Sequence, residues 1–255
     1  MGIPELRRID ISNFVLEHQR ASINELARHL HVSEETIRRD LNALHAQGSV
    51  VKVHGGAIAP NTPRHGTFER RSVLQSEEKR RIALAARKLF AAGDSLMIDA
   101  GSTTHILSEV MAPGGPFTVI TNSLPVARNF WQVGKGHTVV MLGGNLLLDT
   151  EETLGEIALQ QLKQFSVDHA ILTISGITEA GQIMRYRIDE VMIARVMTER
   201  AKNVTIVADH TKIFRPALMT ICNLSRVTHL VTDRKPPAQF AQLLADCGTN
   251  VVVAE

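Results

Sequence analysis

The 255-residue sequence predicts an α/β domain with a mostly parallel sheet, preceded by a small helical domain that ends in a β hairpin. From residue 95 onward, short apolar strand candidates alternate with helical stretches, a pattern typical of parallel sheets covered on both faces. Residues 1 to 57 instead contain short amphipathic helices and a β-branched segment followed by Gly-Gly. The length suits two domains, since a single domain most often holds about 100 to 150 residues.

The composition excludes several classes of protein. Hydrophobic residues make up 44% and charged residues 21%, which is globular composition rather than that of a disordered chain. No apolar run approaches the roughly 20 residues that span a bilayer, and the polar start lacks a secretory signal, so we expect a cytoplasmic protein without membrane contact. Cys222 and Cys247 lack metal-ligand spacing. We therefore expect no metal, and no motif indicates a cofactor.

The net charge of +2 does not identify a partner. Residues 1 to 81 carry 13 Lys or Arg against 10 Asp or Glu, so the N-terminal excess is small. Because bulk charge decides nothing here, any case for nucleic-acid binding must rest on the placement of individual side chains.

The N-terminal helices are predicted from their caps. Residues 22 to 25, Ser-Ile-Asn-Glu, fit a capping box, so a helix should begin there. Ser33 is a second N-cap candidate, for a helix that turns Ile37, Leu41 and Leu44 inward. A helical stretch from about Pro4 to Gln19 precedes both, and Gly48 should end the third helix.

The third helix and the hairpin form a candidate DNA-binding surface. Rotation by about 100° per residue from the buried Ile37 directs four hydrogen-bonding side chains outward, namely Glu35, Arg38, Arg39 and Asn42. Arg, Asn and Glu recognise guanine, adenine and cytosine in the major groove, and Thr36 near the helix start would reach a phosphate. Residues 50 to 53 predict a strand, and His54-Gly55-Gly56 a wing tip. An ordinary solvated face is the alternative, but caps, tight turn, paired arginines and wing together favour a winged helix-turn-helix.

A linker separates the two domains. Residues 59 to 66 are rich in turn formers and predict a hinge, so we place the domains at 1–57 and 76–255 with a linker at 58–75. The charged run from Glu77 to Arg81 leads into a helix predicted to turn Ile82, Leu84, Ala85 and Leu89 inward. Its charges fit either a solvated helix start, which we favour, or an extension that contacts DNA phosphates.

The second domain alternates strands and helices. The predicted strands are 95–98, 118–121, 138–142, 170–174, 205–208, 229–232 and 250–253. The predicted helices are 103–110, 124–131, 156–165, 189–200 and 238–246. In such sheets a ligand lies beyond the carboxyl ends of the strands.

Small and polar residues follow several of these strands. Residues 97 to 104 predict a strand, a small-residue turn and a helix start, where free amides and hydroxyls can cradle a phosphate. Four further strands end in polar or glycine-rich segments: 121–123, 143–144, 175–176 and 208–212. Gly and Ser often end strands for turn reasons alone, but their joint placement at one sheet edge predicts a ligand site.

The segment from Val32 to Leu41, followed by His54-Gly55-Gly56-Ala57, resembles the signature of the DeoR family of bacterial transcriptional regulators. The resemblance covers nearly the whole chain and includes 99–104, 119–123, 142–144 and 208–212. It implies an N-terminal winged helix-turn-helix and a C-terminal α/β sensor related to sugar-phosphate isomerases. Residues 174–177 and 189–191 are most similar to the glycerol-3-phosphate repressor branch.

The resemblance implies roles for individual residues. Ser33 to Asn42 would be the recognition helix, and the expected DNA contacts are Ser33, Glu35, Thr36, Arg38, Arg39, Asn42, His54 and Gly55. In the family the small-residue loop binds the effector phosphate, and the lysine at the position of Lys212 helps to hold the anion. The expected effector contacts are Asp99, Gly101, Ser102, Thr103, Thr104, Asn122, Gly143, Gly144, Arg187, Glu190 and Lys212.

Two positions depart from the family pattern. The segment before Glu190 usually carries an acidic residue where this chain has Arg187, and the helix after it usually carries a lysine where this chain has Ala194. A guanidinium in place of a carboxylate reverses the preferred partner from a hydroxyl or cation to an anion. Two explanations stay open: Arg187 meets the anion of a different effector, or it points to solvent or pairs with Glu190 or Asp189.

The leading functional hypothesis is a repressor of a carbohydrate or phosphosugar operon that binds double-stranded operator DNA and is released by a phosphorylated sugar. Family members respond to simple sugar phosphates, and one type to phosphosugars from plant-tumour opines such as agrocinopine. A homodimer or homotetramer is expected, because one recognition helix reads few base pairs. We expect no catalytic residue; the alternative is a sugar-phosphate isomerase-like enzyme with Asp99, Asp189, Glu190 or Asp209 as base. A nucleoid or RNA-binding protein is a third class.

Overall fold

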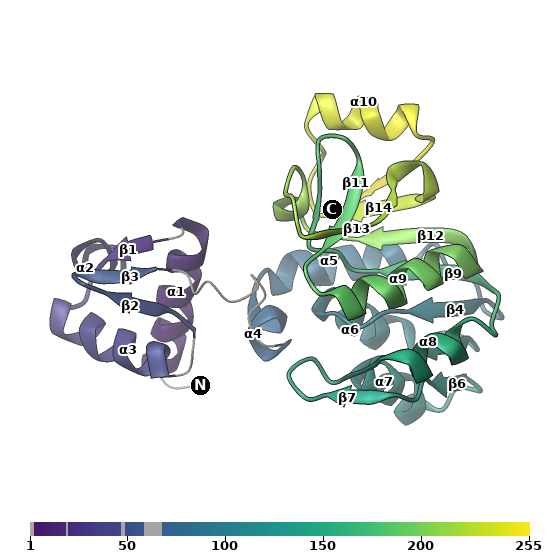
Figure 1. Ribbon diagram of the computed structural model, residues 1–255, viewed down its shortest axis with the longest axis horizontal. Coiled ribbons are helices and arrows are strands. Elements are labelled where there is room, and N and C mark those ends of the chain that lie inside the picture. The colour runs from purple at the N-terminus through teal and green to yellow at the C-terminus, as the bar shows by residue number, and fades with distance from the viewer. Residues whose placement is uncertain (1–2, 19, 47–48, 59–67) are drawn as a thin grey trace. The chain divides into compact units, whose positions relative to one another are not determined.

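The chain forms two compact units, Met1–Gly66 and Thr67–Glu255. The computed structural model describes residues 3–18, 20–46, 49–58 and 68–255 (Figure 1). The predicted hinge at 59–66, the helix-ending Gly48 and Gln19 lie outside these residues. Within the described ranges, no helix is long and apolar enough to cross a membrane.

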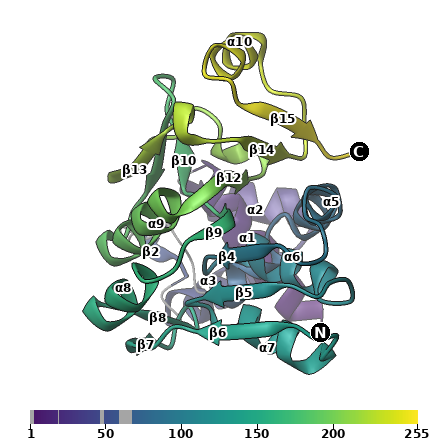
Figure 2. The ribbon, with the colours of Figure 1, turned by 90° about the vertical axis from the view of Figure 1, so that its right-hand side faces the viewer.

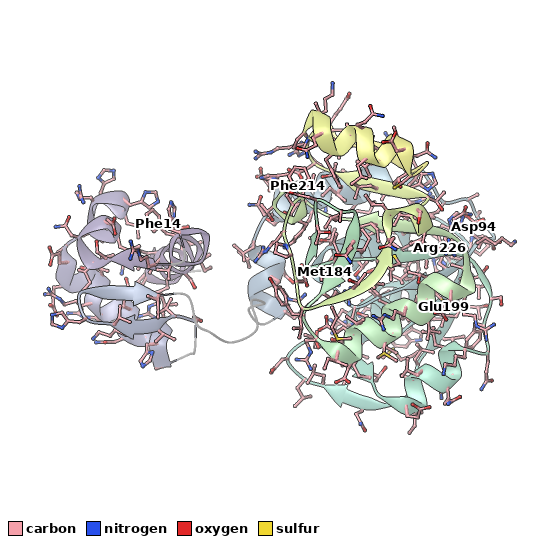
Figure 3. The ribbon with its side chains drawn as sticks, turned by 45° about the horizontal axis from the view of Figure 1, so that its top comes forward. Phe14, Asp94, Met184, Glu199, Phe214 and Arg226 are labelled. Carbon is pink, nitrogen blue, oxygen red and sulfur yellow. The ribbon has the colours of Figure 1, made fainter. Side chains whose placement is uncertain are left out.

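The first unit is a winged helix-turn-helix, as the sequence predicts. Its helices are α1 (Ile3–His18), α2 (Ile23–Leu30) and α3 (Glu34–Ala46), and its sheet has the order β1-β3-β2, with β1 Arg20–Ser22, β2 Val51–Val53 and β3 Gly56–Ile58. The strand β1 was not predicted; its three residues pair antiparallel with β3. The core of the unit gathers ten buried apolar side chains from all three helices and the sheet. Phe14 packs beside this core, with its ring centroid 4.2 Å from that of His18 (Figure 3).

The predicted helix caps are present. The Glu25 amide donates to Ser22 Oγ at 3.2 Å, and the Ser22 amide donates to Glu25 Oε2 at 2.8 Å, which completes the capping box. Ser33 Oγ accepts from the Thr36 amide at 3.2 Å and so caps α3. Between the two helices His31 adopts a left-handed conformation, φ 53°, which closes α2 in a tight turn.

Among the side chains that the structure describes in this unit, one buried charge is Asp40. Asp40 on α3 is 1% exposed and pairs with Arg7 at 2.6 Å and with Arg8 at 2.9 Å, both on α1. The acidic residue therefore fastens α1 to the back of α3, because a buried carboxylate needs both charge compensation and hydrogen bonds.

The second unit is built on a seven-stranded sheet with the order β15-β14-β12-β9-β4-β5-β6, in which every pairing is parallel. The strands are β4 Ser95–Ile98, β5 Thr118–Thr121, β6 Thr138–Met141, β9 Val167–Leu172, β12 Ala201–Val207, β14 His229–Thr232 and β15 Asn250–Val253. All seven predicted strands are thus confirmed. The central strands β9 and β12 begin three and four residues earlier than predicted, since their first residues also pair, Ala201 with Val167.

Helices cover both faces of the sheet (Figure 2). On one face α5 (Ser76–Arg87), α6 (Ser102–Met111) and α7 (Leu124–Val133) share a core with Leu96 and Ile98. On the other face α8 (Glu156–Leu162), α9 (Ile188–Arg200) and α10 (Ala238–Asp246) share a core with Met97. The alternation of Leu96, Met97 and Ile98 between the two cores follows from the two-residue period of a strand.

Two small antiparallel elements flank the main sheet and were not predicted. A hairpin joins β7 (Asn145–Leu147) to β8 (Glu152–Leu154), and a second sheet has the order β10-β11-β13, with β10 Gly176–Ile177, β11 Gln182–Arg185 and β13 Met219–Asn223. Two 3-10 turns, His210–Lys212 and Leu224–Arg226, follow β12 and β13. The hairpin and the second sheet connect to the strand ends at which a ligand site was expected.

The entry into this unit differs from the prediction. Phe68–Val73, inside the predicted linker, form the helix α4, in which Ser72 Oγ donates to the Phe68 carbonyl at 2.9 Å. On α5 the expected inward residue Leu84 is 50% exposed, whereas Lys79 is 5% exposed. The buried stripe of α5 runs through Lys79, Ile82, Ala83 and Ala86. Ile82 is buried as expected and Ala85 and Leu89 pack against the same core, so the expectation is wrong for Leu84 alone.

Candidate functional site

The predicted recognition face lies on α3 and is exposed. Glu35, Arg38, Arg39 and Asn42 are all exposed, while Ile37 and Leu41 on the opposite side are buried. Arg38 lies 3.2 Å from Glu34 and 3.9 Å from Glu35, so its charge is shared with its own helix. Arg39 forms no ion pair with any residue that the structure describes. Its guanidinium is therefore available to an outside partner.

The wing stands next to this face. Lys52 on β2 donates to Asn42 Oδ1 at 2.7 Å, which joins the wing to the recognition helix. His54 and Gly55 form the exposed turn between β2 and β3, and Gly55 has φ +78°, a value that favours glycine. The Gly55 carbonyl accepts from the Ile23 amide at 2.9 Å and ties the turn to α2. Lys52 is a candidate contact that sequence reasoning missed, because its proximity to Asn42 depends on the hairpin.

At the start of α3, the hydroxyls of Ser33 and Thr36 form a hydrogen bond with each other. Ser33 Oγ and Thr36 Oγ1 are 2.8 Å apart, and Ser33 also caps the helix. Both residues therefore order the first turn of α3, where backbone amides face outward. Their predicted contact with DNA remains a prediction.

In the second unit, polar residues follow three adjacent strands. Asp99 follows β4, Asn122 follows β5, and Thr173 follows β9; β4 lies between the other two in the sheet. Asp99 and Asn122 are each 1% exposed. Parallel strands end at one edge of a sheet, so these residues gather at that edge, as the sequence predicts.

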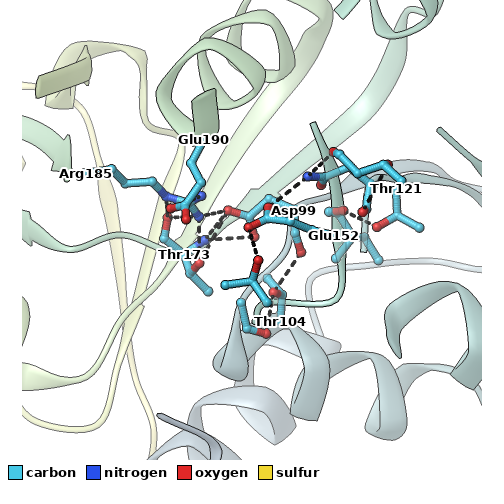
Figure 4. A network of polar contacts seen from close by, with 12 residues as sticks. Asp99, Thr104, Thr121, Glu152, Thr173, Arg185 and Glu190 are labelled. Atoms are coloured by element: carbon cyan, nitrogen blue, oxygen red, sulfur yellow. Dashed lines mark hydrogen bonds and ion pairs between the residues drawn. The ribbon is translucent and has the colours of Figure 1, made fainter. Parts of the chain in front are cut away.

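Asp99 is held by a buried arginine. Its carboxylate accepts from the Thr173 amide at 3.0 and 3.2 Å and from Arg185 Nη2, while Arg185 also donates to the Thr173 carbonyl at 2.8 Å (Figure 4). Burial raises the pKa of Asp99 to about 6, although Arg185 and the Thr173 amide act against the shift. Burial alone would lower the pKa of Arg185, but Asp99, Glu190 and Glu152 together raise it.

Two further carboxylates complete this group. Glu190 on α9 lies 3.5 Å from Arg185 and 3.3 Å from Arg187. Glu152 on β8 is 2% exposed and accepts from Thr150 Oγ1 at 2.7 Å and from Asn122 Nδ2 at 3.1 Å. Burial and the nearby Glu190 raise the pKa of Glu152 to about 7. The arginine–carboxylate cluster consists of Asp99, Glu152, Arg185, Arg187 and Glu190.

Lys212 belongs to a second group of charges. Burial lowers the pKa of Lys212 and lowers that of Lys79 to about 8, while the carboxylate of Asp209 opposes both shifts. Asp209 accepts from the Thr211 amide at 3.0 Å, and its pKa is lowered by Lys212, Thr211 and Lys79 against the effect of burial. Lys79, Asp209 and Lys212 form the lysine cluster.

The glycine and threonine of the small-residue loop have structural duties. Thr104 Oγ1 donates to the Asp99 carbonyl at 2.9 Å and to the Gly101 carbonyl at 3.1 Å. A Cβ on Gly101 would lie 2.3 Å from Thr173 Oγ1, so only glycine lets the loop approach the end of β9. Ser102 and Thr103 are buried in the first turn of α6. The loop is thus held in a shape that presents the start of α6 at the strand edge.

Gly143 and Gly144 are explained by the turn after β6. The Gly143 amide donates to Gln161 Oε1 at 2.7 Å. Gly144 has φ +129°, and a Cβ there would lie 2.5 Å from the Leu154 carbonyl oxygen. Turn geometry accounts for Gly144, and an effector contact at either glycine remains a prediction.

The two departures from the family pattern have different surroundings. Arg187 is the N-terminal flanking residue of α9, its side chain is 36% exposed, and it pairs with Glu190, one of the explanations left open by the sequence. Its Nε is buried but makes no hydrogen bond of good geometry to a described residue. Ala194 is fully buried in the core on that face of the sheet, so a lysine there would need a polar neighbour.

Sequence reasoning missed Arg185, Glu152, Lys79 and Arg71. Arg185 shares the inward parity of Ile183 on β11, and Lys79 falls in the apolar stripe of α5, so a charged residue at an inward position was the available signal. Glu152 and Arg71 lie on elements that were not predicted, and the sequence offered no comparable signal for them.

Comparison with known proteins gives a consistent result over both units. Residues 7–63 match the DeoR-like helix-turn-helix domain, and residues 74–234 match the DeoR C terminal sensor domain. The glycerol-3-phosphate regulon repressor of Escherichia coli (strain K12) is 33% identical over 240 residues, covering 94% of this chain and 95% of the relative. The HTH-type transcriptional repressor CsqR of the same strain is 31% identical over 259 residues, covering 100% of this chain and 99% of the relative.

Among solved structures, ribose 5-phosphate isomerase A of Methanocaldococcus jannaschii matches 55% of this chain and 55% of its own, with a TM-score of 0.39 and 15% identity. The helix-turn-helix match includes the recognition helix, and the sensor match includes the strand ends that carry the charged clusters. The chain therefore belongs to the DeoR family, with a helix-turn-helix domain followed by the DeoR sensor domain.

Proposed function

We propose that this chain is a sequence-specific DNA-binding repressor of an operon for carbohydrate or phosphosugar catabolism, and that a phosphorylated sugar releases it from its operator. One observation carries the proposal: a single chain combines an exposed hydrogen-bonding helix face on α3 with charged clusters at the carboxyl ends of β4, β5, β9 and β12. The names of its relatives, which are repressors, support the same conclusion.

The DNA-binding step is assigned to α3 and the wing. Arg38 and Arg39 donate in bidentate fashion to guanine, Asn42 reads adenine, and Glu35 accepts from cytosine. Ser33 and Thr36 position backbone amides at the start of α3 that contact a DNA phosphate, while His54 and Gly55 at the wing tip contact the DNA sugar-phosphate backbone. A second copy of the chain supplies the second half-site, so we expect a homodimer or homotetramer. A protein that reads chromosomal DNA works in the cytoplasm.

The effector-binding step is assigned to the strand edge. The loop from Gly101 to Thr104, with Lys212, receives the phosphoryl group. Asn122 and Glu190 offer acceptors to sugar hydroxyls, Asp99 positions Arg185 and the end of β9 beside them, and Arg187 adds a cation that the family pattern lacks. Effector binding weakens operator affinity if the ligand favours a conformation or subunit arrangement that fits DNA poorly.

A sugar-phosphate isomerase is the second candidate, and one observation favours it. Glu152, with a pKa of about 7, has the protonation behaviour of a general base at neutral pH. Against an enzyme, three of the four carboxylates proposed from the sequence are engaged: Asp99 by Arg185, Glu190 by Arg185 and Arg187, and Asp209 by Thr211. Turnover of pentose or hexose phosphates by the purified chain would revive this candidate.

The test of the repressor is a fluorescence-anisotropy titration with DNA taken from upstream of its own and neighbouring genes. We expect tight binding to one fragment, weaker binding to unrelated DNA of equal length, and release by a phosphorylated sugar but not by the same sugar without phosphate. Equal affinity for all fragments would contradict sequence-specific recognition, and binding without release by any sugar phosphate would contradict the effector class.

A further inference from the structure

Arg71 on α4 lies near several charged residues of the sensor but forms no ion pair with any residue that the structure describes. Its side chain is half-buried and its Nε is buried, yet that Nε donates no hydrogen bond to any residue that the structure describes. Its guanidinium lies over the ring of Phe68, 6.0 Å from the centroid. A buried guanidinium donor without an acceptor is costly, so its position calls for a partner that is brought in from outside.

Electrostatically, Arg71 connects the two charged clusters. The carboxylates of Glu190, Glu152 and Asp99 raise its pKa against the effect of burial, which lowers it overall. In the other direction Arg71 lowers the pKa of Lys79 and of Lys212. Among the described residues of α4 and α5 that shift the pKa values of these groups, Arg71 alone affects members of the lysine cluster and is itself affected by the arginine–carboxylate cluster. Arg71 therefore lies close enough to both clusters to be affected by their charges, and its carbonyl accepts a hydrogen bond directly from Lys79 of the lysine cluster.

The charges around this position call for an anion. The arginine–carboxylate cluster has three acidic and two basic members, and the lysine cluster has one acidic and two basic members. The two clusters are neutral together when all groups are ionised, so Arg71 makes the sum positive. The pKa of Glu152, about 7, increases this surplus by partial protonation at neutral pH. A phosphate monoester carries about −1.5 to −2 at that pH and matches it.

The helix that carries Arg71 is held to the sensor at both of its ends. The Phe68 amide donates to the Asp149 carbonyl at 3.1 Å, and the Phe68 ring packs edge-on against His105, with centroids 5.5 Å apart. Lys79 Nζ donates to the Leu74 carbonyl at 2.6 Å and to the Arg71 carbonyl. α4 begins directly after residues 59–67, the segment that leads from the first unit. Any ligand contact on Arg71 thus acts on the chain segment between the DNA-binding unit and the sensor.

We propose that Arg71 is an anion-binding residue of the sensor, donating its guanidinium to the phosphoryl group of the ligand, and that this contact closes α4 over the site. The inference rests on the proposed function. It adds Arg71 to the residues that bind the effector and α4 as the segment whose position depends on whether the effector is bound. Arginine suits this role because its planar fork binds phosphate oxygens in pairs. The connection to DNA binding is then direct, since the ligand orders the start of the second unit.

The test uses the full chain and three probes: ribose 5-phosphate, glycerol 3-phosphate and inorganic phosphate. Isothermal titration compares wild type with Arg71→Ala, Arg71→Lys and a matched control, Arg80→Ala, which removes an exposed arginine from α5. We expect Arg71→Ala to lower the affinity for the phosphate-containing probes about tenfold or more and Arg71→Lys to lower it less. The control should bind the probes with wild-type affinity. Circular dichroism checks that the variants fold.

Hydrogen exchange of residues 68–73 provides a readout that a purely structural role would not change. We expect the bound probe to slow exchange in wild type and in Arg80→Ala but not in Arg71→Ala. Wild-type affinity in both Arg71 variants, or no binding of any probe by wild type, overturns the inference. Failure of the proposed function is recognised separately, by absence of specific DNA binding in the part of the anisotropy titration to which no sugar phosphate is added.

Discussion

The recognition face of α3 and the arginine–carboxylate cluster of the sensor keep their charges in opposite environments. On α3 the pair of Arg38 and Glu34 is 3.2 Å apart with side chains 50% and 47% exposed, whereas Arg185 and Asp99 in the sensor are 5% and 2% exposed. An exposed pair contributes about 0 to 1 kcal/mol and exchanges partners readily. A buried pair costs about 3 to 5 kcal/mol when one partner is removed. Charges on the recognition face are therefore available to DNA, while charges in the sensor hold the site in shape.

The largest effect is expected from breaking the buried pair. Arg185→Ala leaves Asp99 buried without its counter-charge and should lower the free energy of unfolding of the sensor by about 3 to 5 kcal/mol. Urea denaturation followed by circular dichroism measures the loss. The double variant Arg185→Met with Asp99→Asn removes both charges and should recover much of the stability. A loss below about 1 kcal/mol in Arg185→Ala would mean that the pair is screened like a surface pair.

The next effect concerns pH. A carboxyl whose pKa is higher in the folded than in the unfolded chain stabilises the fold while it is protonated. Burial raises the pKa of Glu152 from 4.5 to about 7 and that of Asp99 from 3.8 to about 6. Their contribution is fully present below the ordinary pKa values and is lost as the pH rises through 6 and 7. For Glu152 the change is on the order of 3 kcal/mol.

We therefore expect the urea concentration at the unfolding midpoint of the sensor to decrease as the pH is raised from 5 to 8. Glu152→Gln keeps a neutral, hydrogen-bonding side chain at this position and should make the dependence shallower. Exposed Glu156→Gln serves as the control and should follow wild type. If wild type and Glu152→Gln have the same pH dependence, Glu152 does not contribute to stability as a buried carboxyl with a raised pKa.

The smallest effects on stability, with a clear effect on binding, are expected on the recognition face. Arg38→Ala and Arg39→Ala should each change the free energy of unfolding by less than about 0.5 kcal/mol, because both side chains are exposed. Each should weaken operator binding by roughly 1 to 3 kcal/mol if the side chain is bidentate to guanine. Anisotropy titrations at fixed salt measure the change. Unchanged operator affinity in both variants would contradict the assignment of this face.

Local sequence signals were sufficient where structure is decided locally. Ser22 with Glu25, and Ser33 with Thr36, cap their helices as predicted, since both interactions lie within one turn. The seven strands of the parallel sheet were found from short apolar runs between helices. Arg185 was missed because its partner Asp99 is 86 positions away, and no periodicity connects an antiparallel flanking strand to the end of β4.

Arg187 and Arg185 show the limit most clearly. The sequence directed attention to Arg187, a departure from the family pattern, yet the residue that neutralises Asp99 is Arg185, two positions earlier on β11. Alternation along β11 indicates that Arg185 and Ile183 share a side of the strand. Which partner that side meets depends on how β11 packs, and no single-sequence pattern specifies that packing.

The sequence by itself determined the two-part architecture, the helix caps, the exposed face of α3 and the sheet edge at which polar residues gather, because periodicity and capping are short-range properties. Only the tertiary structure decided which charges are buried together. It joined Asp99, Glu152, Arg185 and Glu190 from four separate elements and placed Arg71 of α4 beside them. Burial and pairing of charges depend on long-range packing, and that packing turns scattered polar residues into a candidate binding site.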